Sequence, residues 1–405
     1  MQKIFYGGHV LTFNEMKSEE AFLVNDGSIV LTGKNDEVLQ MKTDQTELVD
    51  LKGKTVCPSF FYVAGSVFKE IEKRLKNTNK ADLIEKISEN NENYDKFCNF
   101  DIYLEEFLNI QAELISAGVL TVQETQINEI SFSFFKKLAD QKLIKINIIG
   151  YVDILTSKDV MDNNCRSYRK YQNGFRLAGF SLELDGNVAS RTAWLNSSYV
   201  HPSHFLGMGN LFDEQLNFVV KTALEEKRQL VVFANGDRAI AQLFRCFENN
   251  FKDNLDTMRP LLVGAEMFSK RHLKDAEKFK FSLCVKNEKE SQKLAKRNLG
   301  FLRFRKFNDL KMVVSNNLKI AVGNGEFVDS VLTDVDKMSI NLSKKTMFDA
   351  LQAATLNSAF VCFEDINLGS IENGKKANFV VLSGNPYQMA EVKVLHTFFE
   401  GNEIK

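Results

Sequence analysis

Two short segments of the sequence place carboxylates beside basic or hydroxyl side chains, which is the combination that proton transfer and ligand binding require. The segment LDGNVASRTAWL contains Asp185, Arg191 and Thr192. The segment FANGDRAI contains Asp237 and Arg238. A carboxylate at a strand end can act as a general acid or base when burial raises its pKa. Asp185, Asp237 and Arg238 are therefore candidate catalytic residues.

Two further carboxylates and a pair of histidines extend the set of candidates. Glu124 and Glu266 lie near the ends of apolar runs of strand length, where each could serve as a general base. His201 and His204 form the motif HPSH, in which two imidazoles three residues apart could meet on one side of a turn. Glu124 and Glu266 are therefore candidate general bases, and the two histidines are candidate metal ligands.

A structural explanation of these residues stays open beside the catalytic one. Asp185 and Gly186 could form a turn, and Asp237 could cap a helix that begins near Arg238. Glu124 and Glu266 could be solvated acids at strand ends. In that case the segments shape the loops of a site without reacting themselves.

The elements that must position these residues alternate between apolar runs and amphipathic segments. Continuous Val, Ile and Leu runs fit strands that are covered on both faces, and strand–helix alternation implies a parallel sheet. About eight such units predict a TIM-like (β/α)8 barrel. The predicted strands are 120–124, 144–153, 180–184, 229–233, 260–263, 281–285, 301–304 and 320–323, and the predicted helices are 67–76, 81–90, 104–117, 213–227, 238–249, 270–278, 289–297 and 345–357.

Both ends of the chain lack this strand–helix alternation and instead show a pattern of strands and turns. Near the N-terminus, Asp26 and Gly27 stand between two β-rich runs, as in a hairpin turn. The C-terminal part returns to strands and turns. We therefore expect an α/β protein with a discontinuous β-sandwich domain from residues 1–57 and 366–405, and a barrel domain from residues 58–365.

The amino-acid composition argues against some classes of binding partner and indicates a cellular compartment. The chain has 52 Lys and Arg against 53 Asp and Glu, so no field of one sign would attract nucleic acid or an anionic membrane. No signal peptide is evident, and no run reaches the roughly 20 apolar residues of a membrane helix. Six cysteines without a CxxC pair predict reduced, mostly buried thiols. These features predict a soluble cytoplasmic protein.

Several segments, in order along the chain, resemble the metal-dependent amidohydrolase superfamily. LDGNVASRTAWL and FANGDRAI are similar to the "DGS-x-GSRTA" and "HAIGDRA" signatures of the branch that includes N-substituted formamide deformylase. ALQAATLNSAF and LGSIENGKKANFVVL are similar to the ending found across the superfamily. The resemblance implies a barrel that hydrolyses non-peptide C–N bonds with one or two divalent metals such as zinc at its carboxyl-terminal mouth.

At the positions where the resemblance implies metal ligands and the proton-transfer group, the sequence departs from the family. The motif "PGF-x-D-x-H-x-H" falls on PSFFYVAGS, which has no histidine. The family's lysine, two further histidines and late aspartate also have no counterpart. The residues at these positions are Ala64, Ser66, Ser181, Phe233, Gly264 and Gly325 (or its neighbour Asn324).

Three functions remain open from the sequence. The favoured one is a protein folded like the enzyme that has lost its metal, expects no cofactor, and binds a small molecule or a protein partner. The second is an active hydrolase with a rebuilt or metal-independent site around Asp185, Asp237, His201 and His204. The third is a structural subunit, and association of copies of the chain is a further option. The expected pocket residues are Asp185, Arg191, Thr192, Phe233 and Asp237.

Overall fold

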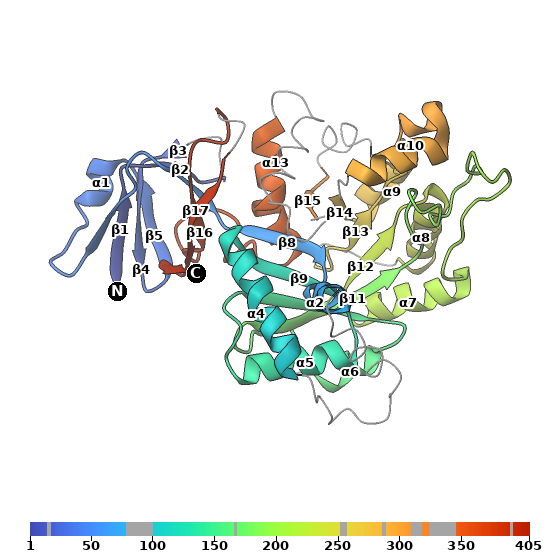
Figure 1. Cartoon of the computed structure of the whole chain (residues 1–405), viewed down its shortest axis with the longest axis horizontal. Helices are drawn as coiled ribbons and strands as arrows, with labels where there is room; N and C mark the ends of the chain where they lie inside the picture. The colour runs from blue at the N-terminus through green and yellow to red at the C-terminus, as the bar shows by residue number, and fades with distance from the viewer. Residues whose placement is uncertain are drawn as a thin grey trace.

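A parallel sheet of eight strands forms the centre of the protein. The computed structural model describes residues 1–13, 18–77, 100–165, 168–251, 257–285, 289–308, 318–323, 346–388 and 392–405. Each strand pairs in parallel with the next one in sequence, and the first and last strands lie against each other (Figure 1). The sheet is therefore nearly closed into a TIM-like barrel. Its strands are β8 (Phe60–Gly65), β9 (Val119–Ile127), β10 (Asn147–Asp153), β11 (Phe175–Glu183), β12 (Gln229–Ala234), β13 (Leu261–Gly264), β14 (Ser282–Val285) and β15 (Ile320–Val322).

Helices connect the strands and cover the outside of the sheet (Figure 1). α8 shows the reason, because its buried residues Ile240, Leu243, Phe244 and Phe247 recur at helical spacing and form an apolar stripe. The helices of the barrel are α2 (Val67–Lys76), α4 (Phe100–Ser116), α5 (Glu129–Asp140), α6 (Lys158–Asn163), α7 (Asp213–Glu225), α8 (Asp237–Asn250), α9 (Lys270–Lys278), α10 (Lys289–Phe304), α13 (Thr346–Ala354) and α14 (Leu356–Val361).

One predicted strand is wrong. Residues 301–304 form the last turn of α10, following Gly300, whose φ of 74° kinks the helix. Phe301 and Leu302 are 68% and 76% exposed, so this apolar run faces outward. The eighth strand is instead β8, which precedes β9. The predicted helix 81–90 lies outside the described residues.

Apolar side chains fill the interior of the barrel. Phe61, Val63, Tyr151, Val231 and Val263 point inward from four strands and pack together in one buried cluster. Residues of α14 and its C-terminal end belong to the same cluster. The lumen is thus a packed core, and free space is found at its carboxyl-terminal mouth.

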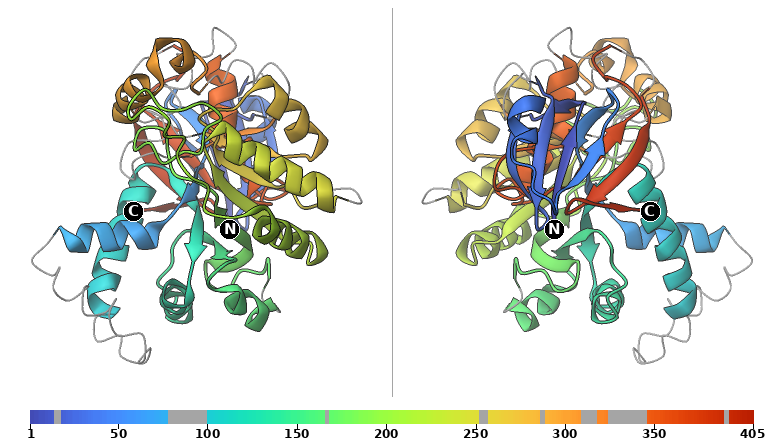
Figure 2. Two further views of the ribbon diagram at one scale, coloured as in Figure 1. Left: turned by 90° about the vertical axis from the view of Figure 1, so that its right-hand side faces the viewer. Right: turned by 90° about the vertical axis from the view of Figure 1, so that its left-hand side faces the viewer.

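The two ends of the chain form separate sheets beside the barrel. β16 (Phe379–Leu382) pairs antiparallel with β7 (Thr55–Pro58), which places the C-terminal tail in one sheet with the N-terminal segment. Figure 2 shows these strands together at one side of the barrel. The six-stranded sheet adds β17 (Val394–Phe399), β18 (Asn402–Ile404), β2 (His9–Leu11) and β3 (Ser18–Glu19), and the four-stranded sheet consists of β1 (Gln2–Tyr6), β4 (Ala21–Asn25), β5 (Ser28–Gly33) and β6 (Glu47–Asp50), with α1 (Asn35–Leu39) after β5.

Aromatic rings hold these two sheets together. Phe5 stacks on Phe22 at 4.9 Å between ring centroids, and Phe379 stacks on Phe398 at 4.6 Å. Phe5 also meets Phe379 edge to face at 5.0 Å. The rings come from both ends of the sequence, so the terminal sheets share one core. The sequence-based expectation of a barrel with a β-sandwich from both termini is confirmed.

Among the described residues, no helix combines the length and apolar character needed to cross a bilayer.

Candidate functional site

A cavity of about 150 Å³ lies at the carboxyl-terminal mouth of the barrel, beyond the ends of β12 and β13. In barrels of parallel strands this end carries the functional sites, because the loops after the strands gather there. The cavity is therefore the candidate site. Its lining residues are Asn187, Phe233, Asn235, Val263, Gly264, Glu266, Ser291, Phe307 and Asn308.

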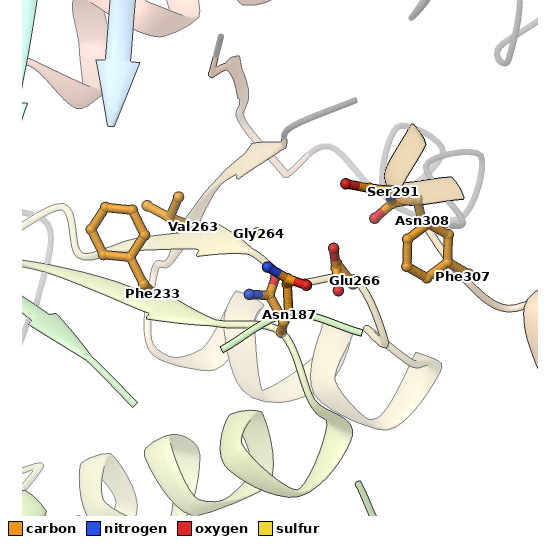
Figure 3. A pocket seen from close by; sticks show the side chains of 9 residues that line it. Asn187, Phe233, Val263, Gly264, Glu266, Ser291, Phe307 and Asn308 are labelled. Atoms are coloured by element: carbon orange, nitrogen blue, oxygen red, sulfur yellow. The ribbon is translucent and has the colours of Figure 1, made fainter. Parts of the chain in front are cut away.

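The two sides of the cavity differ in polarity. Phe233 and Val263 lie on one side, continuous with the apolar core of the barrel (Figure 3). Ser291, Asn308 and the ring of Phe307 lie on the other side, which is therefore mixed in polarity, and Glu266 stands between the two groups (Figure 3). A ligand here would place an apolar group against the barrel and a polar group toward Glu266.

Glu266 is held in place by the segments around it. Its Oε2 accepts a hydrogen bond of 2.7 Å from the backbone N–H of Val188. Its backbone carbonyl accepts one of 2.9 Å from the N–H of Asn308. Asn298 of α10 donates from Nδ2 to the carbonyl of Val188 at 2.9 Å. The carboxylate therefore has a fixed position at the cavity, as a pre-organised binding group requires.

In the cavity wall, the side chain of Asn235 fills the space next to Gly264. Gly264 has a φ of 90°, and a Cβ atom at this position would overlap Oδ1 of Asn235. Asn235 cannot easily move away, because its Nδ2 donates to the carbonyl of Gly186 at 2.9 Å. Sequence reasoning missed Asn235. Its place two residues after Phe233, at the alternating spacing of a strand, is the signal that could have found it.

Asp185 binds backbone groups of the loops and does not line the cavity. It is 1% exposed, and its oxygens accept hydrogen bonds from the backbone N–H groups of Trp194 at 2.7 Å and of Asn235 and Gly236 at 2.8 Å each. Burial raises its pKa to about 6, although the three hydrogen bonds oppose this. The carboxylate joins the loop after β11 to the end of β12.

Asp237 and Arg238 also contact the loop after β11. Asp237 is the first residue of α8, and Gly236 takes the N-cap position that the sequence analysis gave to Asp237. The Oδ1 of Asp237 accepts a hydrogen bond of 2.8 Å from the N–H of Asn196. The guanidinium of Arg238 lies 4.5 Å from the ring centroid of Trp194. Neither residue lines the cavity.

Arg191, Thr192 and the histidine pair lie on the exposed loop. Arg191 donates to the carbonyl of His201 at 3.1 Å, and Oγ1 of Thr192 accepts from the N–H of Asn187 at 3.0 Å. His201 and His204 are both exposed. Within the described ranges, no group of three or more His, Cys, Asp and Glu side chains is arranged to hold a metal ion.

At the positions where the resemblance implies metal ligands, the side chains are buried or hydrogen-bonded to other groups of the protein. Ala64 is buried, and Ser66 caps α2 by accepting from the N–H of Lys69 at 3.1 Å. Ser181 donates to the carbonyl of Tyr151 at 3.1 Å and accepts from the N–H of Gln126 at 2.8 Å. These side chains, with Phe233 and Gly264, do not fit a divalent metal, which needs several nitrogen, oxygen or sulfur ligands around one point. Gly325 and Asn324 lie outside the described residues.

Glu124 lies at the amino end of α2. It is 1% exposed and accepts hydrogen bonds from the Oγ of Ser66 at 2.5 Å and from the N–H groups of Val67 at 2.6 Å and Phe68 at 3.3 Å. A carboxylate is stabilised at a helix N-terminus, yet burial dominates and raises its pKa to about 7. Its hydrogen bonds hold α2 against β9.

Comparisons with known proteins agree with this architecture. The sequence model described as "Amidohydrolase family" matches residues 99–404. The protein LONG AFTER FAR-RED 3 of Arabidopsis thaliana is 24% identical over 255 residues, which are 56% of this chain and 43% of that protein. This chain therefore aligns with less than half of the length of that curated relative.

Two solved structures have a similar fold. One is an uncharacterized metal-dependent hydrolase from Pyrococcus furiosus, with a TM-score of 0.80, 16% identity, and coverage of 96% of this chain and 100% of that one. The other is an uncharacterized metal-dependent hydrolase from Pyrococcus horikoshii OT3, with a TM-score of 0.75, 18% identity and full coverage of both chains. At such identities the likeness concerns the fold alone.

Proposed function

Because this chain belongs to the amidohydrolase family, we propose that it is a member that has lost the metal centre and binds a small molecule at the mouth of the barrel without hydrolysing it. The observation that carries this proposal is the pair Phe233 and Gly264, which line the cavity where the family resemblance implies histidine ligands. A phenyl ring and a hydrogen atom offer no donor to a metal ion.

The remaining positions support the same conclusion. Ala64 is hydrocarbon, and the hydroxyl groups of Ser66 and Ser181 are engaged with Glu124 and Tyr151. A metal in such an enzyme supplies a bound hydroxide at neutral pH, because it lowers the pKa of water to about 7. Without that nucleophile, an unactivated C–N bond would not be cleaved at a useful rate. Binding is the function that the cavity retains.

The alternative of a rebuilt hydrolytic site is less favoured by the contacts. Asp185 uses both oxygens on backbone N–H groups, and Asp237 binds the N–H of Asn196. His201 and His204 are exposed on the loop. These four residues lie outside the cavity lining.

Metal content after purification without chelators tests the proposal. We expect less than about one tenth of an equivalent of zinc or manganese per chain after incubation with either metal and desalting, because a structural or catalytic site would retain it. The double variant His201→Ala with His204→Ala is the matched control for metal held by the exposed pair. A stoichiometric metal that persists in this variant would refute the loss of the metal centre.

Ligand binding is the second part of the test. A molecule that binds the folded state at 100 times its dissociation constant adds about 2.7 kcal/mol to the free energy of unfolding. A screen of small molecules by thermal unfolding should therefore find compounds that raise the midpoint. A chain that no compound stabilises would favour a structural subunit instead.

Two finer parts of the proposal rest on the sequence. The branch is the one that includes N-substituted formamide deformylase, because both signatures that it resembles belong there. The compartment is the cytoplasm, because the six cysteines form no CxxC pair and Cys57, Cys246, Cys284 and Cys362 are buried.

A further inference from the structure

Four buried hydrogen-bond donors without an acceptor lie together at the amino-terminal end of the barrel, at the opposite end from the cavity. They belong to Tyr168 and Arg169, in the segment before β11, and to Arg228, directly before β12. We infer that these three residues, the amino-end cluster, bind an oxyanion of the phosphate type. This site is separate from the ligand site proposed at the mouth of the barrel.

Missing acceptors are concentrated in the amino-end cluster. Among the described residues, nine buried side-chain nitrogen and oxygen atoms have no hydrogen-bond partner. Four of the nine are Oη of Tyr168, Nε and Nη2 of Arg169, and Nε of Arg228. An unsatisfied buried donor costs free energy, so such groups in folded proteins are almost always paired with protein, water or an ion. Four of them in one place therefore indicate an acceptor from outside the chain.

The ring of Tyr168 brings the two arginines together. The guanidinium carbon of Arg228 lies 3.7 Å from the centroid of this ring, and that of Arg169 lies 5.1 Å from it. One anion beside the ring is therefore within reach of both cations. All three side chains are partly exposed, so the cluster can be reached from solvent.

The N–H groups of Arg169 have the arrangement that two oxygens of one anion require. Nε and Nη2 stand on the same edge of the planar guanidinium, which is the geometry of bidentate binding to phosphate. The ring of Phe363, 3.6 Å from the guanidinium carbon, covers a face of the group and leaves this edge without a partner. A phosphate keeps further oxygens for Tyr168 and Arg228, whereas a water molecule would leave the buried positive charges uncompensated.

The carboxylate beside Arg228 in the described part of the chain is engaged with another cation. Glu226 lies 2.8 Å from Nζ of Lys158 but 3.9 Å from Nε of Arg228, which is too far for a hydrogen bond. Residues 166–167, which lie outside the described ranges, are arginine and serine and bring no negative charge.

Arg169 also differs from its neighbour Arg176. Burial lowers the pKa of Arg169. Burial acts in the same direction on Arg176, but Tyr171 and Glu364 outweigh it and raise the pKa of that residue. Glu364 accepts a hydrogen bond of 2.8 Å from Nη2 of Arg176. A bound anion would give Arg169 the compensation that Glu364 gives to Arg176.

Titration of inorganic phosphate into protein dialysed against a phosphate-free buffer tests the inference. Binding would be measured by calorimetry and by the midpoint of thermal unfolding, at neutral pH and constant ionic strength, with chloride as the comparison anion. We expect saturable binding of phosphate and sulfate, and no saturable effect of chloride. Phenyl phosphate distinguishes the sources of the oxyanion. Tighter binding than phosphate would indicate a phosphorylated organic ligand, and weaker binding would indicate the free ion.

Two variants locate the anion. Arg228→Gln should weaken phosphate binding by about tenfold or more, because it removes a charged donor. Tyr168→Phe should also weaken it by about tenfold. Without phosphate, Tyr168→Phe should not lower the unfolding midpoint, since the hydroxyl has no hydrogen bond within the described structure to lose. Arg245→Gln is the matched control, because the side chain of Arg245 on α8 is 54% exposed and lies outside the cluster, and it should leave the affinity unchanged.

Each remaining outcome would overturn the inference. Equal effects of phosphate and chloride would reflect ionic strength alone. Absence of phosphate binding by the wild-type chain would mean that the donors are satisfied by the chain or by water. Unchanged affinity in both Arg228→Gln and Tyr168→Phe would place the bound phosphate elsewhere. The wild-type titration needs no variant, so it decides the matter even if a variant does not fold.

Discussion

The side chain of Asn235 occupies the space that any side chain at position 264 would need. A Cβ atom on Gly264 would overlap Oδ1 of Asn235, whose Nδ2 is bonded to the carbonyl of Gly186. A residue larger than glycine at position 264 therefore requires this hydrogen bond to break. Asn235 and its hydrogen bond therefore favour glycine at position 264.

Gly264→Ala tests this relationship. The variant should lower the free energy of unfolding by about 1–2 kcal/mol for its left-handed backbone and by a further 1–3 kcal/mol for overpacking. Gly374→Ala is the control, because Gly374 has a similar φ of 88° and no atom within 4 Å of its added Cβ. Urea denaturation of both variants measures the difference. Equal losses would show that Asn235 yields freely.

Asp185→Asn should destabilise the barrel mouth. The amide would direct N–H donors at one of the carboxylate positions that now accept from Trp194, Asn235 and Gly236. We expect a loss of about 2–4 kcal/mol in the free energy of unfolding, because buried donors lose their acceptor. Asp237→Asn, which removes a carboxylate with one hydrogen bond to Asn196, should cost less than about 1 kcal/mol. The reverse order would exclude a structural role for Asp185.

Glu124 should make stability depend on pH. Its pKa is raised to about 7 in the folded protein from an ordinary value of 4.5, so the folded state binds the proton more tightly than the unfolded state. The resulting contribution to stability is fully present below pH 4.5 and is lost as the pH rises through about 7. The loss is of the order of 3 kcal/mol.

The variant Glu124→Gln should remove this part of the slope between pH 5 and pH 8. Glu225→Gln, a change at an exposed residue of α7, should leave the slope as in the wild type. Urea unfolding at several pH values gives the comparison. A slope that is the same in all three proteins would show that Glu124 does not titrate in this range.

Phe363→Leu should weaken the attachment of the segment after α14 to the amino-terminal end of the barrel. The ring of Phe363 lies under the guanidinium of Arg169 at 3.6 Å and under that of Arg259 at 4.8 Å. Loss of the ring should cost about 1–2 kcal/mol of unfolding free energy. Phe301→Leu, at a ring that is 68% exposed, should cost less than about 0.5 kcal/mol. Equal effects in the two variants would contradict the stacking role of Phe363.

Local patterns in the sequence were enough to predict most of the barrel. Seven of the eight predicted strand ranges overlap strands of the sheet, because Val, Ile and Leu runs record burial on both faces. The run at 301–304 has the same composition and is helical. A short apolar run cannot by itself distinguish a buried strand from the exposed end of a helix.

For the candidate site, too, the sequence determined some features and left others open. The sequence by itself determined that Ala64, Ser66, Ser181, Phe233 and Gly264 carry no imidazole, carboxylate or amine, since residue type is a local fact. It also brought Glu266 into consideration. The sequence could not show which groups in the fold these side chains contact.

Only the tertiary structure decided which groups meet. Glu124 binds residues 56–58 positions away in the chain, and Asp185 binds Asn235 and Gly236 at separations of 50 and 51. These pairings arise because β8 pairs in parallel with β9, and β11 with β12, so that the segments at their carboxyl ends lie side by side. A sequence pattern reports the periodicity of its own segment, whereas a buried hydrogen bond depends on where two distant segments come to lie.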